Sequence, residues 1–104
     1  MKINKRIECA DGFSMSVQGN SGAYCSPRID NAEKYIEVEV GYARPHEDLL
    51  EMFHDGDGIY PHVPCQVVVD VIAKHGCPTQ VLSASIRSVQ RAVRSWYNGA
   101  HVVT

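Results

Sequence analysis

The chain has 104 residues, of which 44% are apolar and 21% charged, and its formal net charge is −2. Folding a chain of this length buries roughly 65% of the surface that the unfolded chain exposes. One domain with a hydrophobic core is therefore expected to be stable without a metal or a disulfide. No run approaches the roughly 18 consecutive apolar residues of a membrane span, and no apolar signal core follows Met1. We therefore expect a cytoplasmic protein with no membrane partner.

The N-terminal third predicts a β-hairpin. Residues 2–9 place Ile3, Ile7 and Cys9 on one face, and Asp11-Gly12 is a tight-turn signal. Residues 13–17 then alternate apolar and polar side chains, which is the period of a half-buried strand. Two antiparallel strands are expected here.

The clearest strand signal covers residues 34–42. Ile36, Val38 and Val40 would lie on its buried face, and the opposite face would carry Tyr35, Glu37 and Glu39. This one-sided pattern is typical of an antiparallel sheet with one face in solvent.

Residues 45–53 predict a short helix, because Pro45 suits a first helical turn. Leu49, Leu50 and Phe53 would then point inward. Residues 54–58 contain two Asp-Gly pairs and predict a loop, since the spacing of an EF-hand is missing.

Residues 60–64 predict an extended segment, because each proline disfavours helix in the residue before it. Residues 64–76 predict a helix that ends at Gly76. The four valines of this stretch leave a buried strand over residues 67–72 as the alternative.

Residues 80–97 show the strongest helical periodicity. One face carries an apolar seam of Leu82, Ile86, Val89, Val93 and Trp96. The seam is interpreted as core, with a homodimer through this helix as the alternative. The other side carries Arg87, Arg91 and Arg94, whose guanidinium groups are suited to phosphates.

Together these elements predict an α+β fold in one domain over residues 1–104, sheet-rich over 1–43 and helical over 45–99. We expect a small antiparallel sheet of three or four strands packed against two or three helices. The C-terminal helix should be the longest.

Charge is distributed unevenly along the chain. Residues 30–70 carry ten acidic and two basic side chains, a balance of −8, whereas residues 71–104 carry four basic side chains and no acidic one. An acidic surface of this kind can dock on a basic groove of another protein, and an ordinary solvated face is the alternative. The candidate partner-binding residues are Glu37, Glu39, Glu47, Asp48, Glu51, Asp55 and Asp57.

Motifs with known chemistry are missing from the sequence. The four cysteines form no Cys-x-x-Cys pair, and we expect them to be reduced. The pairs His62-x-x-Cys65 and His75-x-Cys77 do not match a standard zinc spacing. We find no phosphate loop, zinc-protease motif or nucleophile elbow. The protein is predicted to be no enzyme, with no catalytic residue, metal or cofactor.

Several short sequence segments resemble segments of small accessory proteins encoded by bacteriophages and prophages. The resemblance covers about residues 1–76 and rests on Gly12-Phe-Ser-Met-Ser-Val-Gln18, Tyr24-Cys-Ser-Pro-Arg28, Val38-Glu-Val-Gly-Tyr42, Tyr60-Pro-His-Val-Pro64 and Val71-Ile-Ala-Lys-His-Gly76. Proteins of this kind include anti-CRISPR inhibitors, which bind CRISPR effector complexes. The resemblance implies a non-enzymatic phage inhibitor that acts in the cytoplasm of a bacterial host cell and binds a host defence complex, such as a type I CRISPR surveillance complex. A small nucleic-acid-binding regulator using the terminal arginines is the second hypothesis.

Overall fold

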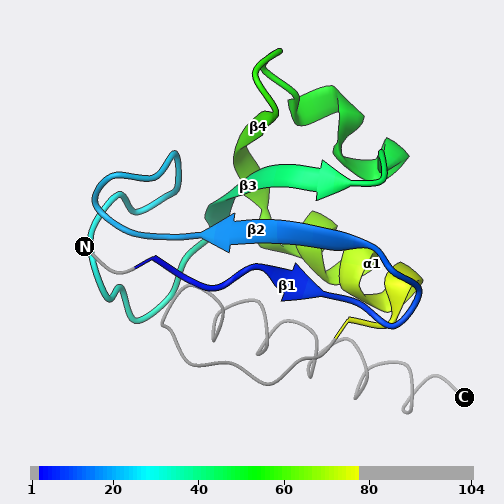
Figure 1. Ribbon diagram of the computed structural model, residues 1–104. Helices are drawn as coiled ribbons and strands as arrows, with labels where there is room; N and C mark the ends of the chain where they lie inside the picture. Colours follow the sequence, from blue (N-terminus) through cyan, green and yellow to red (C-terminus); the bar gives the residue numbers. More distant parts are fainter. Residues whose placement is uncertain (1–2, 78–104) are drawn as a thin grey trace, which may run out of the picture.

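A computed structural model describes residues 3–77 of the chain (Figure 1). These residues form a four-stranded antiparallel sheet in the order β1-β2-β3-β4, together with one α-helix and one 3-10 helix. The elements are β1 (Ile7–Glu8), β2 (Ser14–Gln18), β3 (Glu37–Arg44), η1 (Asp48–Phe53), β4 (Ile59–Pro64) and α1 (Cys65–His75). The predicted α+β class is confirmed.

The expected helix over residues 80–97 lies outside the described residues. The same holds for its apolar seam, for the proposed homodimer contact and for the nucleic-acid face formed by Arg87, Arg91 and Arg94. Within residues 3–77, α1 and η1 are the helical elements. No helix among these residues has the length and apolar character needed to cross a bilayer.

The core lies between one face of the sheet and α1, which runs behind β2 in Figure 1. Met15 and Val17 of β2 point into this core, as their alternation predicts. Val38 and Val40 of β3 do the same. The helix contributes Val68, Val69, Val71 and Ile72.

The prediction of a helix after Pro64 is confirmed, and the strand alternative for residues 67–72 is wrong. The buried valines recur at helical spacing and therefore cover the sheet from one side of α1. Gly76 ends the helix in the left-handed conformation with φ 66° and donates its N–H to the carbonyl of Ile72 at 3.0 Å. Glycine adopts this conformation without the steric cost of a Cβ atom.

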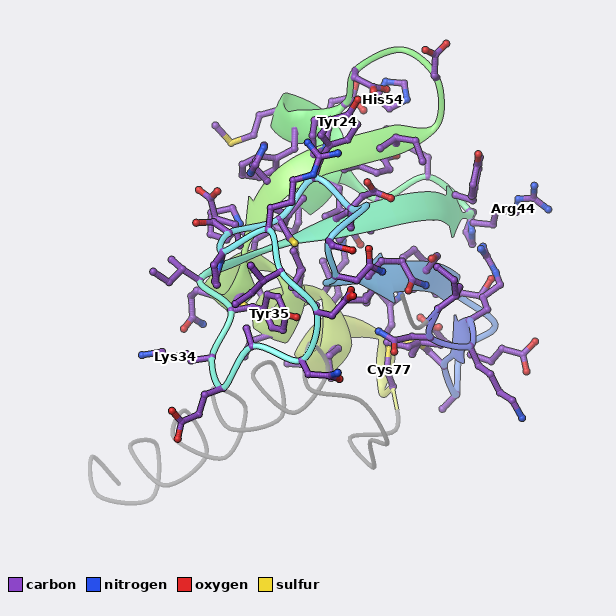
Figure 2. The ribbon with its side chains drawn as sticks, turned by 90° about the vertical axis from the view of Figure 1, so that its left-hand side faces the viewer. Tyr24, Lys34, Tyr35, Arg44, His54 and Cys77 are labelled. Atoms are coloured by element: carbon purple, nitrogen blue, oxygen red, sulfur yellow. A yellow bond between two sulfur atoms is a disulfide. The ribbon has the colours of Figure 1, made fainter. Side chains whose placement is uncertain are left out.

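The strand predicted from residue 34 begins only at Glu37, and the residues before it lie differently than expected. Tyr35 is buried, because its hydroxyl donates to the carbonyl of Ile29 at 2.7 Å and accepts from the N–H of Ala32 at 3.0 Å. Ile36, expected on the buried face, is 66% exposed. Figure 2 shows Lys34 pointing outward and Tyr35 lying within its loop.

The first strand is shorter than predicted and covers two residues instead of residues 2–9. Ahead of it, side chains take the place of the strand hydrogen bonds. The backbone N–H of Asn4 donates to Gln18 Oε1 at 2.8 Å, and Gln18 Nε2 donates to the carbonyl of Asn4 at 2.9 Å. Ile3, expected on the apolar face, is exposed.

Cys9 and Cys77 form a disulfide, so the expectation of four reduced cysteines is wrong for this pair. The fold brings the end of β1 to the end of α1, where the N–H of Ala10 donates to the carbonyl of Gly76 at 3.2 Å. Figure 2 shows Cys77 near the end of the molecule opposite to His54. Disulfides persist in oxidising compartments, so the cytoplasmic location stays a prediction.

Candidate functional site

The seven predicted partner-binding carboxylates do not form one surface. Glu37 and Glu39 are half-buried on β3, and Glu47 is fully buried. The remaining four are exposed on η1 and on the loop that follows it: Asp48, Glu51, Asp55 and Asp57. We call residues 46–58 the η1 lobe; it stands at the top of Figure 1, beyond β3 and away from β1.

The winding of η1 decides which of its apolar residues are exposed. In a 3-10 helix residues three apart share a face, whereas an α-helix would group Leu49, Leu50 and Phe53. Leu50 and Phe53 therefore share the inner face, where Leu50 is fully buried and Phe53 is half-buried. Leu49, predicted to point inward, is 40% exposed and shares its outer face with Met52, which is 84% exposed.

The third face of η1 is acidic. Asp48 and Glu51 are three residues apart and both side chains are exposed. His46 lies between them, with Nε2 at 3.1 Å from Asp48 Oδ1 and at 3.4 Å from Glu51 Oε2. An exposed apolar face thus runs directly beside an exposed acidic face.

The loop after η1 adds two further carboxylates in a fixed turn. Asp55 Oδ1 accepts the N–H of Asp57 at 2.9 Å, and the N–H of Asp55 donates to the carbonyl of Ile59 at 3.1 Å. The ring of His54 packs against Tyr60 with the centroids 5.0 Å apart. The predicted loop over residues 54–58 is confirmed, and these contacts tie it to β4.

We expect Gly58→Ala to destabilise the protein more than Gly56→Ala does. Both glycines have positive φ, at +79° and +100°. A Cβ atom at Gly58 would lie 3.2 Å from the ring of Tyr42, whereas a Cβ at Gly56 would meet open space. The cost at Gly58 should be about 2 kcal/mol and that at Gly56 about 1 kcal/mol, measured by urea denaturation. Equal losses would show that Tyr42 does not fix this turn.

Glu47 was expected on the acidic surface but is only 1% exposed, because it anchors the η1 lobe to α1. Its Oε2 accepts the N–H of Leu49 at 2.7 Å, and its Oε1 lies 2.9 Å from Lys74 Nζ. Burial alone would raise the pKa of Glu47, but the hydrogen bonds from Leu49, Lys74 and His75 outweigh it and lower the pKa from 4.5 to about 2. Glu47 is therefore an ionised structural group.

Glu37 and Glu39 hold other parts of the chain. Glu37 Oε1 lies 3.0 Å from His62 Nδ1, and Glu39 Oε2 accepts the N–H of Tyr24 at 2.9 Å. Glu37 pairs with Pro64, at the end of β4 away from the η1 lobe. These two carboxylates do not join the other four.

The histidine and cysteine side chains of the described residues make contacts within the fold. Among residues 3–77 no group of three or more histidine, cysteine or acidic side chains is placed to hold a metal ion. Of the two His/Cys pairs noted in the sequence, His75-x-Cys77 offers no free thiol to a metal, because Cys77 is bound in the disulfide. Burial raises the pKa of Cys65 to about 11, and its thiol donates to the carbonyl of Tyr35 at 3.1 Å. A thiol of this kind is protonated at neutral pH and is a poor nucleophile.

Sequence reasoning found the four exposed carboxylates and missed Met52, the most exposed large apolar side chain of the described chain. Its signal is the three-residue spacing from Leu49, because a 3-10 helix aligns residues three apart on one face. We found no match for this chain among protein-family models, curated proteins or solved structures.

Proposed function

We propose that the chain is a non-enzymatic binding protein that docks its η1 lobe on a basic groove of a protein partner, with Met52 as the apolar anchor. The observation that carries this proposal is the exposed Leu49 and Met52 face next to the acidic face of Asp48 and Glu51. Burying a methionine side chain stabilises a contact by about 2 kcal/mol, and its flexibility lets it fill irregular pockets.

The charges around Met52 support a basic partner. Protein interfaces commonly combine an apolar centre with a polar rim, and the acidic side chains of η1 and its loop supply such a rim. Complementary fields raise the association rate and exclude partners of the same charge. At physiological salt they act over about 8 Å, so the carboxylates must lie close to the contact. Their position beside Met52 meets this requirement.

The partner class follows from the resemblance to phage accessory proteins. We infer a phage-encoded inhibitor of a host defence complex, and the first partner to test is a type I CRISPR surveillance complex. Such a complex holds its nucleic acids in positively charged channels, as RNA-guided recognition requires. In such a channel the carboxylates of the η1 lobe would occupy positions that otherwise hold phosphates of the nucleic acid.

The test is surface plasmon resonance of the full chain on the purified, guide-loaded complex, over a series of salt concentrations. Met52→Ala should weaken binding by about tenfold through faster dissociation, because it removes the buried anchor. The double variant Asp48→Asn, Glu51→Gln should slow association at low salt and have little effect at high salt. Glu8→Gln is the matched control, since Glu8 is an exposed carboxylate on β1.

The inhibition itself is read from target binding by the complex. Wild-type protein should block it at a stoichiometric ratio, and Met52→Ala should require correspondingly more protein. If wild type does not bind the complex at low salt, this partner is wrong. If Met52→Ala and Glu8→Gln bind as wild type does, the η1 lobe is not the docking surface.

A further inference from the structure

His75, in the last turn of α1, lies between carboxylates from two distant parts of the chain. Its Nδ1 is 2.5 Å from Oδ2 of Asp11 in the turn between β1 and β2. Its Nε2 is 2.6 Å from Oε1 of Glu47, directly before η1. The imidazole stacks on Phe13 with the centroids 4.1 Å apart, and the side chain is only 12% exposed. Three separate segments therefore meet at one imidazole.

Each of the two carboxylates uses its second oxygen to shape its own segment. Asp11 Oδ1 accepts the N–H of Phe13 at 2.9 Å and so closes the turn between β1 and β2. Glu47 Oε2 accepts the N–H of Leu49 at 2.7 Å and so caps η1. A change in the protonation of His75 therefore affects two places: the start of β2, through Asp11, and the start of η1, through Glu47.

The geometry requires His75 to carry two protons. A carboxylate accepts hydrogen bonds only, and a neutral imidazole has a single N–H. Both ring nitrogens face carboxylate oxygens, so only the imidazolium donates to both. The charges that face one another here are those of Asp11 from the turn, Glu47 from the segment before η1, and Lys74 and His75 from α1.

The surroundings favour the charged form of His75. With His75 protonated, the charges of the two carboxylates and the two cations sum to zero. When His75 loses a proton, the four groups carry a net charge of −1, and one of the two carboxylates, Glu47, is buried. Burial lowers the pKa of His75, but the hydrogen bonds and charges of Asp11 and Glu47 outweigh it, and the pKa is raised above 6.5. The stabilisation is fully present below pH 6.5 and is lost as the pH rises through the raised pKa.

We propose that the imidazolium of His75 is a latch that fixes the η1 lobe and the turn between β1 and β2 to the end of α1, and that loss of one proton opens this latch. A neutral imidazole keeps one of the two hydrogen bonds and gives up the other. As a control on partner binding the latch rests on the proposed function, but its opening is measured on the protein alone.

The test is an NMR titration of the full chain from about pH 5 to about pH 10, which brackets the ordinary histidine pKa. The ring C–H signals of His75 and the amide signals of Phe13 and Leu49 should change with one common midpoint above 6.5. In His75→Gln this shared step should disappear from both amides. In Asp11→Asn the midpoint should fall, and the Leu49 amide should still follow it.

The latch is refuted if His75 titrates at or below 6.5. It is equally refuted if the Phe13 and Leu49 amides show no step at the His75 midpoint. Because no partner is present, failure of the docking proposal in the Met52→Ala experiment leaves this result standing, and the converse also holds.

Discussion

Replacing both Cys9 and Cys77 by serine is expected to lower the free energy of unfolding by about 4 kcal/mol. The disulfide joins residues 68 positions apart and so removes many open conformations from the unfolded chain. In the native protein it joins the ends of β1 and α1, which the hydrogen bond from Ala10 to Gly76 already holds together. The loss is measured by urea denaturation of the variant and of wild type with and without reductant.

The control variant is Cys65→Ser, because Cys65 is a free cysteine of the same sheet and helix layers. This variant keeps the Cys9–Cys77 disulfide, so its stability should still fall on addition of reductant, as that of wild type does. Thiol titration in denaturant should find two groups in the unreduced wild type, Cys25 and Cys65, and four after reduction. Four reactive thiols before reduction would contradict the disulfide, as would a double variant as stable as wild type.

Glu47→Ala should cost about 3 kcal/mol, because three groups lose their shared acceptor at once. The N–H of Leu49 loses its cap, and the cations of Lys74 and His75 lose their buried counter-ion. Lys74 is half-exposed and returns to water, which keeps the cost below that of breaking a fully buried network. The measurement is chemical denaturation near pH 6, where both the carboxylate and the imidazolium are present.

The companion variant Glu47→Gln keeps an oxygen for the Leu49 N–H and loses only the charge, so its cost should be smaller. Since the pKa of Glu47 is lowered from 4.5 to about 2, its contribution is complete above pH 4.5 and is lost as the pH falls towards 2. Wild type and Glu47→Gln should therefore converge in stability in acid. A difference between them that does not change with pH would show that the charge of Glu47 has no role.

The sheet and α1 were predictable because their signals are local. Alternation over residues 13–17 marks β2, and the apolar spacing before Gly76 marks α1. Residues 34–36 broke the same alternation rule, since Tyr35 is held inward by hydrogen bonds to Ile29 and Ala32 in its own loop. A period of two residues cannot report where a strand gives way to such a loop.

The candidate site was predictable in part. Exposure of Asp48 and Glu51 follows from their charge, but burial of Glu47 depends on Lys74 and His75, which are far from it in sequence. The exposure of Met52 depends on the choice between two helix types that differ by less than one residue per turn. The Cys9–Cys77 pairing could not be predicted either, because four cysteines allow several pairings and the sequence does not rank them.

The two outer strands of the sheet set limits on how another molecule can approach the described chain. β1 has only two residues, and β4 carries Pro61 and Pro64, which offer no N–H group. Neither is a good template for an added strand, so these residues do not favour edge-to-edge aggregation or recognition by strand addition. In the proposed docking, the side chains of the η1 lobe make the contact and no strand is added, so binding should be more sensitive to changes in the partner's pocket and charges than to changes at its strand edges.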